Sequence, residues 1–327
     1  MHVLVTGAAG MIGRKLLARL AGDGELNGEA IDHLTLIDVA APDAPAGFKG
    51  KVTAVTADLA AAGVADRLIA PRPRVIFHLA GVVSGEAETD FEKGYHVNLG
   101  GIRNLIEAIR AAGDGYRPKL IFTSSIAVYG APFPHAIPDE FHLTPLTSYG
   151  TQKAIAELLL ADYTRRGFLE GIGIRLPSIC VRPGKPNLAA SGFFSGIIRE
   201  PLAGQEAVLP VSDTVLNTHA SPRAAVGFLI HAAGLSREQI GPRIGLAMPG
   251  VCCTVAEQIE ALTRIAGPKV AARIRRQPDE RVTRMVAGWP HRFDARRARE
   301  LGFVAETSFD EIIRAHIDDE LGGKVPA

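Results

Sequence analysis

The first half of the chain alternates short apolar runs with longer stretches whose apolar residues recur every three or four positions. The apolar runs cover residues 2–6, 34–38, 52–57, 75–80, 120–124 and 171–177. The periodic stretches cover residues 11–20, 97–112 and 147–165. Runs that are apolar throughout are typical of strands buried on both faces of a parallel sheet. The alternation therefore predicts an α/β fold built on a doubly wound parallel sheet.

The amino-acid composition of the chain changes after about residue 180, where proline and glycine become more frequent. Helical periodicity returns at 221–233, 255–266 and 309–320. We therefore predict two units: a sheet domain over 1–177 and a smaller mixed lobe over 178–327. A strand predicted near 215–219 can return to the main sheet, in which case the sheet domain would include residues beyond this boundary. We also expect the tail from residue 322 to fray.

Composition narrows the class of protein. Of 327 residues, 47% are hydrophobic and 22% are charged. Because the formal net charge is only +1, the chain has no strong positive electrostatic field that would attract nucleic acid or an anionic membrane. The three cysteines, Cys180, Cys252 and Cys253, are too few for a disulfide framework, and none lies at zinc-ligand spacing, so we expect no metal. The chain opens directly into a strand, and its apolar runs are too short to span a bilayer. These features together predict a cytoplasmic protein.

The strongest local motif is the glycine-rich sequence VLVTGAAGMIG at residues 3–13. Gly7, Gly10 and Gly13 fall between a predicted strand and a predicted helix, as a dinucleotide diphosphate requires. The diphosphate is then expected on the backbone N–H groups of the helix start, beside Met11 and Ile12. The motif predicts a Rossmann-type domain over 1–177; a plain glycine-rich turn is the alternative.

Two acidic residues suit the adenosine half of such a cofactor. Asp38 ends the second predicted strand, where a carboxylate accepts ribose hydroxyls and repels a 2′-phosphate. No arginine follows Asp38, so we predict NAD rather than NADP. Arg14 is the nearest cation, and we interpret it as an exposed helix residue. Asp58 and Leu59 follow the third strand and suit the adenine, although a generic loop acid explains Asp58 almost as well.

Tyr149 is the one tyrosine of five that has a lysine four residues on, Lys153 in SYGTQK. Residues i and i+4 share a helix face, so the phenol and the ammonium can meet one ligand. A nearby cation lowers the pKa of a phenol from about 10 and makes it a usable base. Ser124 and Ser125 end the fifth predicted strand, at the edge where α/β sheets bind ligands. The alternative is an exposed tyrosine and lysine without chemistry.

Taken in order, TGAAGMIG (6–13), HLAG (78–81), SSIAVYG (124–130) and YGTQK (149–153) resemble the extended short-chain dehydrogenase/reductase family, which includes NAD-dependent sugar epimerases and dehydratases. FDARRARELGF (293–303) is similar to the family's C-terminal region. The resemblance implies a catalytic group of Ser125, Tyr149 and Lys153, with Lys153 also holding the nicotinamide ribose. It further implies cofactor contacts from Leu79, Ala80, Gly81, Asn98, Ser124, Pro177 and Ser178. For Asn98, a buried and satisfied amide is an equal alternative.

The segment from RLPSICVRPGKPN (175–187) to GIIREPLAGQEAVLPV (196–211) departs from the nucleotide-sugar epimerases and resembles dehydrogenases of four-carbon sugar acids. That resemblance implies NAD-linked oxidation of the C2 hydroxyl of D-erythronate to 2-dehydro-D-erythronate. A carboxylate substrate needs a cation or several donors near the cofactor. The candidate substrate residues are Ser84, Ser125, Tyr149, Arg182, Asn187, Thr218 and Arg223, with Lys185 and His219 as further options. Structural ion pairs are the alternative for Arg182 and Arg223.

Two other functions stay open at this point. One is a nucleotide-sugar epimerase or dehydratase that uses the same three residues and recycles its NAD. The other is a cofactor-sensing regulator without catalysis, which the presence of both Tyr149 and Lys153 disfavours. The resemblance also implies a homodimer, paired through the helices near 97–112 and 147–165.

Overall fold

The computed structural model describes residues 1–184 and 191–325. The six predicted apolar runs form six strands of a seven-stranded sheet, in the order β12-β8-β7-β6-β1-β4-β5, in which every pairing is parallel. Its strands are β1 (His2–Thr6), β4 (His33–Asp38), β5 (Lys51–Thr56), β6 (Val75–His78), β7 (Lys119–Ser125), β8 (Glu170–Leu176) and β12 (Gly245–Ala247). The strand order reverses between β1 and β6, which is where doubly wound sheets bind ligands. The predicted Rossmann-type fold is confirmed.

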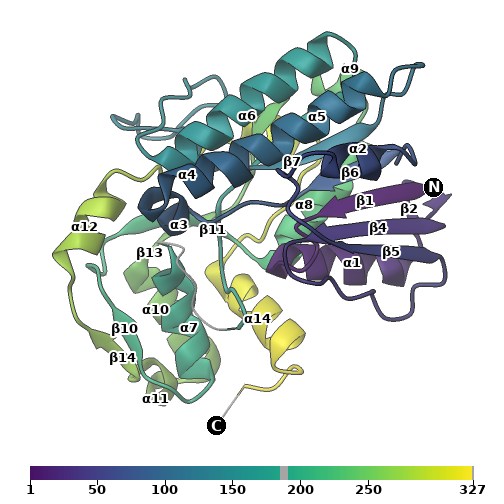
Figure 1. The fold of residues 1–327 in the computed structure, drawn as a ribbon. Coiled ribbons are helices and arrows are strands. Elements are labelled where there is room, and N and C mark those ends of the chain that lie inside the picture. Colours follow the sequence, from purple (N-terminus) through teal and green to yellow (C-terminus); the bar gives the residue numbers. More distant parts are fainter. Residues whose placement is uncertain (185–190, 326–327) are drawn as a thin grey trace.

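Helices cover both faces of this sheet (Figure 1). One layer contains α2 (Val64–Ile69), α5 (Gly101–Ala111) and α6 (Ser148–Arg165). The other contains α1 (Met11–Asp23) and α8 (Pro222–Gly234), and the short α9 (Arg237–Ile240) follows α8. The periodic stretch at 97–112 is not one regular helix: it starts in the π-helical segment η1 (Tyr95–Gly100) and continues as α5. Between β6 and η1 lie α3 (Ser84–Thr89) and α4 (Phe91–Gly94).

The second half of the chain builds a smaller lobe beside the carboxyl edge of the sheet (Figure 1). It holds α7 (Gly192–Leu202), α10 (Val255–Ala266), α11 (Pro268–Ala271), α12 (Glu280–Ala287) and α14 (Phe309–Glu320). A two-stranded sheet pairs β10 (Ala207–Leu209) with β14 (Ile274–Arg276), and a three-stranded sheet has the order β13-β11-β9. These three strands are β13 (Val251–Thr254), β11 (Leu216–Ala220) and β9 (Ser178–Ile179). The lobe has its own buried core, which includes Phe194, Ile198, Leu262 and Ile313.

The two halves of the chain interleave. The strand expected near 215–219 is β11, and it belongs to the three-stranded sheet rather than to the main sheet. The late strand that does join the main sheet is β12, beside β8, and α8 packs into the main core through Phe228 and Leu229. Part of the region after residue 178 therefore completes the sheet domain, and β9 connects that domain to the lobe.

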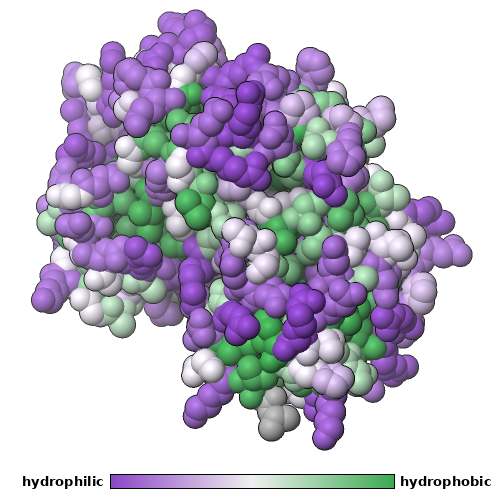
Figure 2. Space-filling model, turned by 180° about the vertical axis from the view of Figure 1, so that it is seen from behind, coloured by the Kyte–Doolittle hydropathy of each residue, from purple (hydrophilic) through white to green (hydrophobic). Residues whose placement is uncertain are grey.

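Smaller elements complete the described chain. A hairpin of β2 (Glu25–Leu26) and β3 (Glu29–Ala30) follows α1. The 3-10 turn η2 (Ile126–Val128) follows β7, and α13 (Arg296–Glu300) lies between α12 and α14 along the chain. No helix among the described residues is both long and apolar enough to cross a bilayer. Seen from behind, hydrophilic residues cover most of the surface and separate its hydrophobic patches (Figure 2).

Candidate active site

A cavity of about 600 Å³ lies at the carboxyl ends of the central strands, where the smaller lobe meets the sheet. Its wall begins at the glycine-rich turn, continues along the residues after β6 and β7 and the start of α6, and ends at residues of the lobe. Its volume falls within the usual range for a small-molecule site. The glycine turn, the tyrosine and the lysine, which are far apart in the sequence, therefore face one space.

The glycine-rich turn is shaped to accept an anion. A Cβ atom on Gly7, whose φ is +71°, would lie 2.6 Å from the backbone nitrogen of Ala80. On Gly13 it would lie 2.2 Å from the carbonyl oxygen of Gly7, so neither position tolerates a side chain. Gly10 precedes α1 and no side chain caps that helix start, which leaves its first amides available to a diphosphate. The residues of this turn that line the cavity are Gly7, Gly10, Met11, Ile12 and Gly13.

Asp38 stands next to this turn at the end of β4. Its carboxylate accepts hydrogen bonds from the backbone N–H groups of Ala9 (3.0 Å) and Ala40 (3.2 Å). The carboxylate thus lies beside the turn, as the prediction for an NAD ribose requires. Asp58 accepts from the N–H of Ala60 at 2.8 Å and contacts His96 Nε2 at 2.8 Å.

Leu59, next along the chain, is buried in the main core. Neither Asp38, Asp58 nor Leu59 lines the cavity itself. Their contacts with the adenosine half of a cofactor therefore stay predictions.

Tyr149 and Lys153 lie on the first two turns of α6, which Thr147 caps by accepting the N–H of Gly150 at 3.1 Å. Both line the cavity. Lys153 is 4% exposed, and its ammonium donates to the carbonyl oxygen of Thr123 at 2.9 Å and lies 5.7 Å from the centre of the Tyr149 ring. The i, i+4 spacing places the ammonium and the phenol on one side of the helix, as predicted.

The two serines after β7 have different environments. Ser124 is buried and donates to Glu157, which also binds Arg175 through both carboxylate oxygens. Ser125 instead accepts the N–H of Ala127 at 3.1 Å, and its hydroxyl lies in the cavity within hydrogen-bonding reach of the Tyr149 phenol. Successive strand residues point to opposite faces. The structure therefore separates a structural serine from a serine that is available to a substrate.

Burial dominates the electrostatics of the site. It raises the pKa of Tyr149 above its ordinary value, while the neighbouring Ser125 hydroxyl and the Arg182 charge act in the opposite direction. The expected net lowering by Lys153 is therefore not found in the free protein, because desolvation of the phenolate outweighs the nearby charges. Burial also lowers the pKa of Lys153 to about 8, against the attraction of Glu157. His78 is buried with a pKa lowered to about 3, so it stays neutral below the site.

The segment after β6 is fixed by hydrogen bonds from beneath. Thr6 Oγ1 accepts the N–H of Ala80 at 3.3 Å and contacts His78 Nδ1 at 2.8 Å. Asn98 accepts the N–H of Val82 at 2.9 Å and donates to Gln152 at 2.7 Å. Leu79 and Gly81 line the cavity, whereas Ala80 and Asn98 do not. Asn98 is thus a buried, satisfied amide that holds this wall, which is the structural alternative left open above.

Arg182 is a cation in the cavity wall whose charge acts on Tyr149. Its guanidinium donates to the carbonyl oxygen of Ile179 at 3.0 Å and to Ser191 Oγ at 2.8 Å. No carboxylate of residues 1–184 or 191–325 lies within ion-pair distance of it, so its charge is uncompensated there. Ser84, Pro177 and Ser178 line the same cavity.

Three predicted substrate residues do not reach this cavity among the described residues. Arg223, at the start of α8, binds Asp319 at 2.6 Å on the surface, so the ion-pair alternative holds for it. Thr218 faces the opposite side of β11, where its hydroxyl donates to the carbonyl of His291 at 2.5 Å. His219 is buried between Phe194 and Phe309. Asn187 and Lys185 lie outside the described residues.

The structure adds residues that sequence reasoning missed. Asn217 lines the cavity and donates to Ser178 Oγ at 2.7 Å. Side chains alternate between the two faces of β11, but the sequence does not show which face each residue takes. Met285 and Trp289, at and beyond the end of α12, also form part of the wall. They lie more than 100 residues from the glycine-rich and tyrosine–lysine motifs, and the nearby segment 293–303 does not include them.

Comparison with known proteins identifies the family of the chain. A model of the "NAD dependent epimerase/dehydratase family" matches residues 3–218. A D-erythronate dehydrogenase of Cupriavidus necator is 47% identical over 98% of each chain, and one of Haemophilus influenzae is 39% identical over 98% of this chain and 100% of its own. The crystal structure of a nucleoside-diphosphate-sugar epimerase from Agrobacterium tumefaciens is 64% identical, covers 100% of this chain and 96% of its own, and superposes with a TM-score of 0.98.

Proposed function

Since the chain belongs to the NAD-dependent epimerase/dehydratase family, we propose that it is a dehydrogenase that oxidises the C2 hydroxyl of D-erythronate to 2-dehydro-D-erythronate. The observation that carries the proposal is a single cavity that joins the glycine turn and the tyrosine–lysine pair to an arginine without a carboxylate partner among the described residues. Two relatives named D-erythronate dehydrogenase, similar over nearly the whole chain, support the choice of substrate.

The residues present fit NAD. The Cβ-free turn at Gly7 and Gly13 and the uncapped start of α1 suit its diphosphate, and Asp38 suits an adenosine ribose without a 2′-phosphate. Lys153 suits the nicotinamide ribose, near Ser178 and Pro177. When bound, NAD supplies the acceptor for the hydride that leaves C2.

The chain's own residues then handle the proton. Ser125 orients the substrate hydroxyl, because its own hydroxyl lines the cavity beside the phenol of Tyr149. Tyr149, as phenolate, removes the hydroxyl proton while the C2–H bond breaks. Lys153 keeps a positive charge beside that phenolate and holds its place through the carbonyl of Thr123. Burial raises the pKa of the phenol in the free protein, and the positive charge of a bound nicotinamide would favour the phenolate.

Arg182 is the group that recognises the substrate's carboxylate. A guanidinium that is largely removed from water binds a carboxylate strongly, since little water competes for it. Ser84, Ser178 and Asn217 offer hydrogen bonds to the remaining hydroxyls. A short sugar acid has both features: one carboxylate and adjacent hydroxyls.

A nucleotide-sugar epimerase is the second candidate, and the similarity to the Agrobacterium epimerase structure favours it. An epimerase returns the hydride to its product, so it produces no net NADH. A dehydrogenase releases NADH in proportion to the substrate consumed. The two functions therefore differ in a quantity that is easy to measure.

The test is to incubate the purified protein and NAD with D-erythronate, with L-erythronate or D-threonate, and with UDP-glucose or UDP-galactose. NADH is followed by absorbance, and the products are separated by chromatography. We expect stoichiometric NADH with D-erythronate and no interconversion of the UDP-sugars. Interconversion of the UDP-sugars without net NADH would instead establish the epimerase. If the protein catalysed none of these reactions, both assignments would be refuted.

We further propose that the protein is a homodimer paired through α5 and α6. On the outward side of α6, Leu158 is 65% exposed, and Ile155 and Leu159 are half-buried. These three residues, here called the α6 apolar strip, lie at helical spacing along α6, with Leu158 exposed and Leu159 packing partly against the main core. A second copy of the same two helices would bury the strip in a four-helix bundle.

A further inference from the structure

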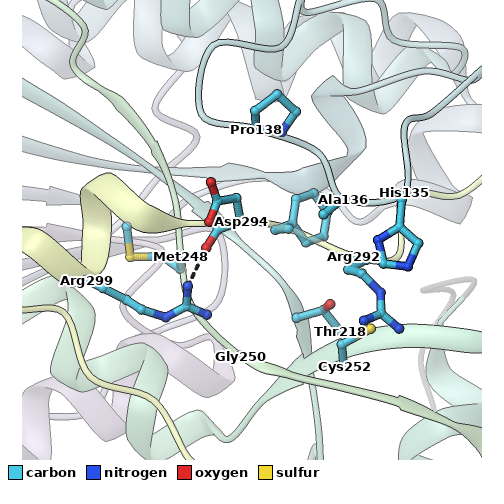
Figure 3. Close-up of a pocket in the computed structure, with 11 residues that line it drawn as sticks. His135, Ala136, Pro138, Thr218, Met248, Gly250, Cys252, Arg292, Asp294 and Arg299 are labelled. Carbon is cyan, nitrogen blue, oxygen red and sulfur yellow. Dashed lines mark hydrogen bonds between the residues drawn. The ribbon is translucent and has the colours of Figure 1, made fainter.

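A second cavity, of about 410 Å³, lies on the opposite side of β11 from the active site. Thr218 of β11 and Cys252 of β13 form part of its floor, and His135, Arg292, Asp294 and Arg299 surround it (Figure 3). Because Asn217 lines the active-site cavity and Thr218 lines this one, the two cavities share a single strand as a wall. Its volume is sufficient for a small organic molecule.

The charges around this cavity are not balanced. Neither Arg292 nor Arg299 is within ion-pair distance of a carboxylate in the part of the chain that the structure describes. Within the described part of the chain, the Arg299 guanidinium donates to the backbone oxygen of Asp294 alone, which is the dashed contact in Figure 3. The single lining carboxylate, that of Asp294, is exposed, as is Arg299, whereas Arg292 is half-buried. Two guanidinium groups against one exposed carboxylate favour an anionic ligand.

The two arginines enter from opposite sides, with Gly250 between them (Figure 3). Apolar side chains, including Met248 and Phe293, complete the lining. Two separated cationic ends with an apolar middle match a molecule that carries one carboxylate at each end. A single inorganic anion would satisfy only one of the two ends.

The same segment of chain serves both cavities. Trp289 and Pro290 line the active site, whereas Arg292 and Asp294 line the second cavity. Between them, the carbonyl of His291 accepts hydrogen bonds from Thr218 Oγ1 (2.5 Å) and Cys252 Sγ (3.3 Å), which attach the segment to β11 and β13. Only Pro290 and His291 separate Trp289 from Arg292, so a ligand held by Arg292 would bind two residues away from the active-site wall.

We propose that the second cavity binds a small dicarboxylate through Arg292 and Arg299, and that its occupancy sets the position of Trp289 in the active-site wall. The site is distinct from the substrate cavity, because it uses different arginines and the other face of β11. The proposal concerns binding and wall position, so it holds or fails independently of which substrate the enzyme oxidises.

The test uses succinate as the dicarboxylate and acetate as the monocarboxylate, at constant ionic strength and without NAD. Binding is measured by calorimetry, and the wall by the fluorescence of Trp289, the only tryptophan of the chain. We expect saturable succinate binding with a matching fluorescence change. Acetate should bind at least about tenfold more weakly, since it satisfies one arginine instead of two.

Variants locate the site. Arg292→Gln and Arg299→Gln should each weaken succinate binding by at least about tenfold, and Arg292→Lys should recover part of the loss. Arg296→Gln is the matched control, because Arg296 is exposed on the same segment but does not line the cavity. Arg182→Gln should leave succinate affinity within about twofold, because Arg182 belongs to the other cavity. Circular dichroism and thermal midpoints confirm that each variant is folded.

Three results would overturn the proposal. The first is the absence of saturable succinate binding to the wild-type protein by calorimetry. The second is loss of binding in Arg182→Gln with retention in Arg292→Gln, which would place the anion in the active site. The third is succinate binding that leaves Trp289 fluorescence unchanged, which would remove the coupling between the cavities.

Discussion

At the residue scale, the position of Tyr149 beside Ser125 and Lys153 makes its phenol the group on which turnover depends. Tyr149→Phe removes only the oxygen, so we expect kcat to fall by about 10²- to 10⁴-fold with little change in NAD affinity. Tyr163→Phe is the matched control, because Tyr163 lies on the same helix, outside the cavity, and packs against Phe168. Steady-state kinetics and NAD titration measure both. Near-normal turnover in a folded Tyr149→Phe protein would show that another group is the base.

The buried ammonium of Lys153 lowers the folding stability of the protein. Its pKa is lowered from 10.5 to about 8 because its ammonium is buried. Between these two values the unfolded chain holds a proton that the folded chain has released, so folding stability rises with pH in that window. Below pH 8 the buried charge costs about 3 kcal/mol.

We therefore expect Lys153→Met to inactivate the enzyme and, near neutral pH, to raise the free energy of unfolding by about 1–3 kcal/mol. The lost hydrogen bond to Thr123 accounts for the lower end of that range. The gain should shrink as the pH rises from about 8 toward 10.5, where the wild-type lysine is neutral when folded. Urea denaturation at several pH values measures it, with the exposed Lys49→Met as control. Equal stability of both proteins at neutral pH would contradict the buried charge.

At the element scale, helix α1 offers two glycines with opposite expected responses. A Cβ atom on Gly13 would meet the Gly7 carbonyl at 2.2 Å, whereas one on Gly22 would meet nothing within 4 Å. Gly13→Ala should therefore distort the turn, cost about 1–3 kcal/mol of stability and weaken NAD binding by at least about tenfold. Gly22→Ala should stabilise the protein by about 0.5–1 kcal/mol and leave NAD binding unchanged. Thermal unfolding and NAD titration compare the pair, and similar NAD affinities would argue against the turn as the diphosphate site.

Elements were predictable from the sequence wherever the pattern was long or carried a motif. The six early strands and the helices at 147–165, 255–266 and 309–320 fall within a residue or two of their predicted bounds. The π-helical start of the stretch at 97–112 was not predictable, because its apolar spacing there also suits an α-helix. For β11, the sequence predicted that a strand exists but not which of its alternate residues face the active site. A shift of one residue decides that Asn217 rather than Thr218 faces the active site.

At the scale of the whole molecule, the limits of sequence reasoning come from the interleaving of the two halves. β12 has only three residues, too few to show a period, yet it adds the last strand to the main sheet. Arg182 and Arg223 looked alike as candidate cations in the sequence. Only packing distinguishes them, since Arg223 meets Asp319 on α14 while Arg182 faces the cavity without a carboxylate partner in the described residues. Such partners are set by tertiary contacts more than 90 residues apart.

The proposed dimer can be tested at the same scale through the α6 apolar strip. Leu158→Arg places a charge at the centre of the expected four-helix bundle, where burying it unpaired would cost several kcal/mol. We expect analytical ultracentrifugation to show a dimer for the wild-type protein and a monomer for this variant at micromolar concentration. Val304→Arg is the control, because Val304 is 78% exposed but lies beyond α13, away from α5 and α6. The active site is built within one chain among the described residues, so the monomer should still bind NAD. A wild-type monomer, or a Leu158→Arg protein that stays dimeric, would show that the exposed strip has another role.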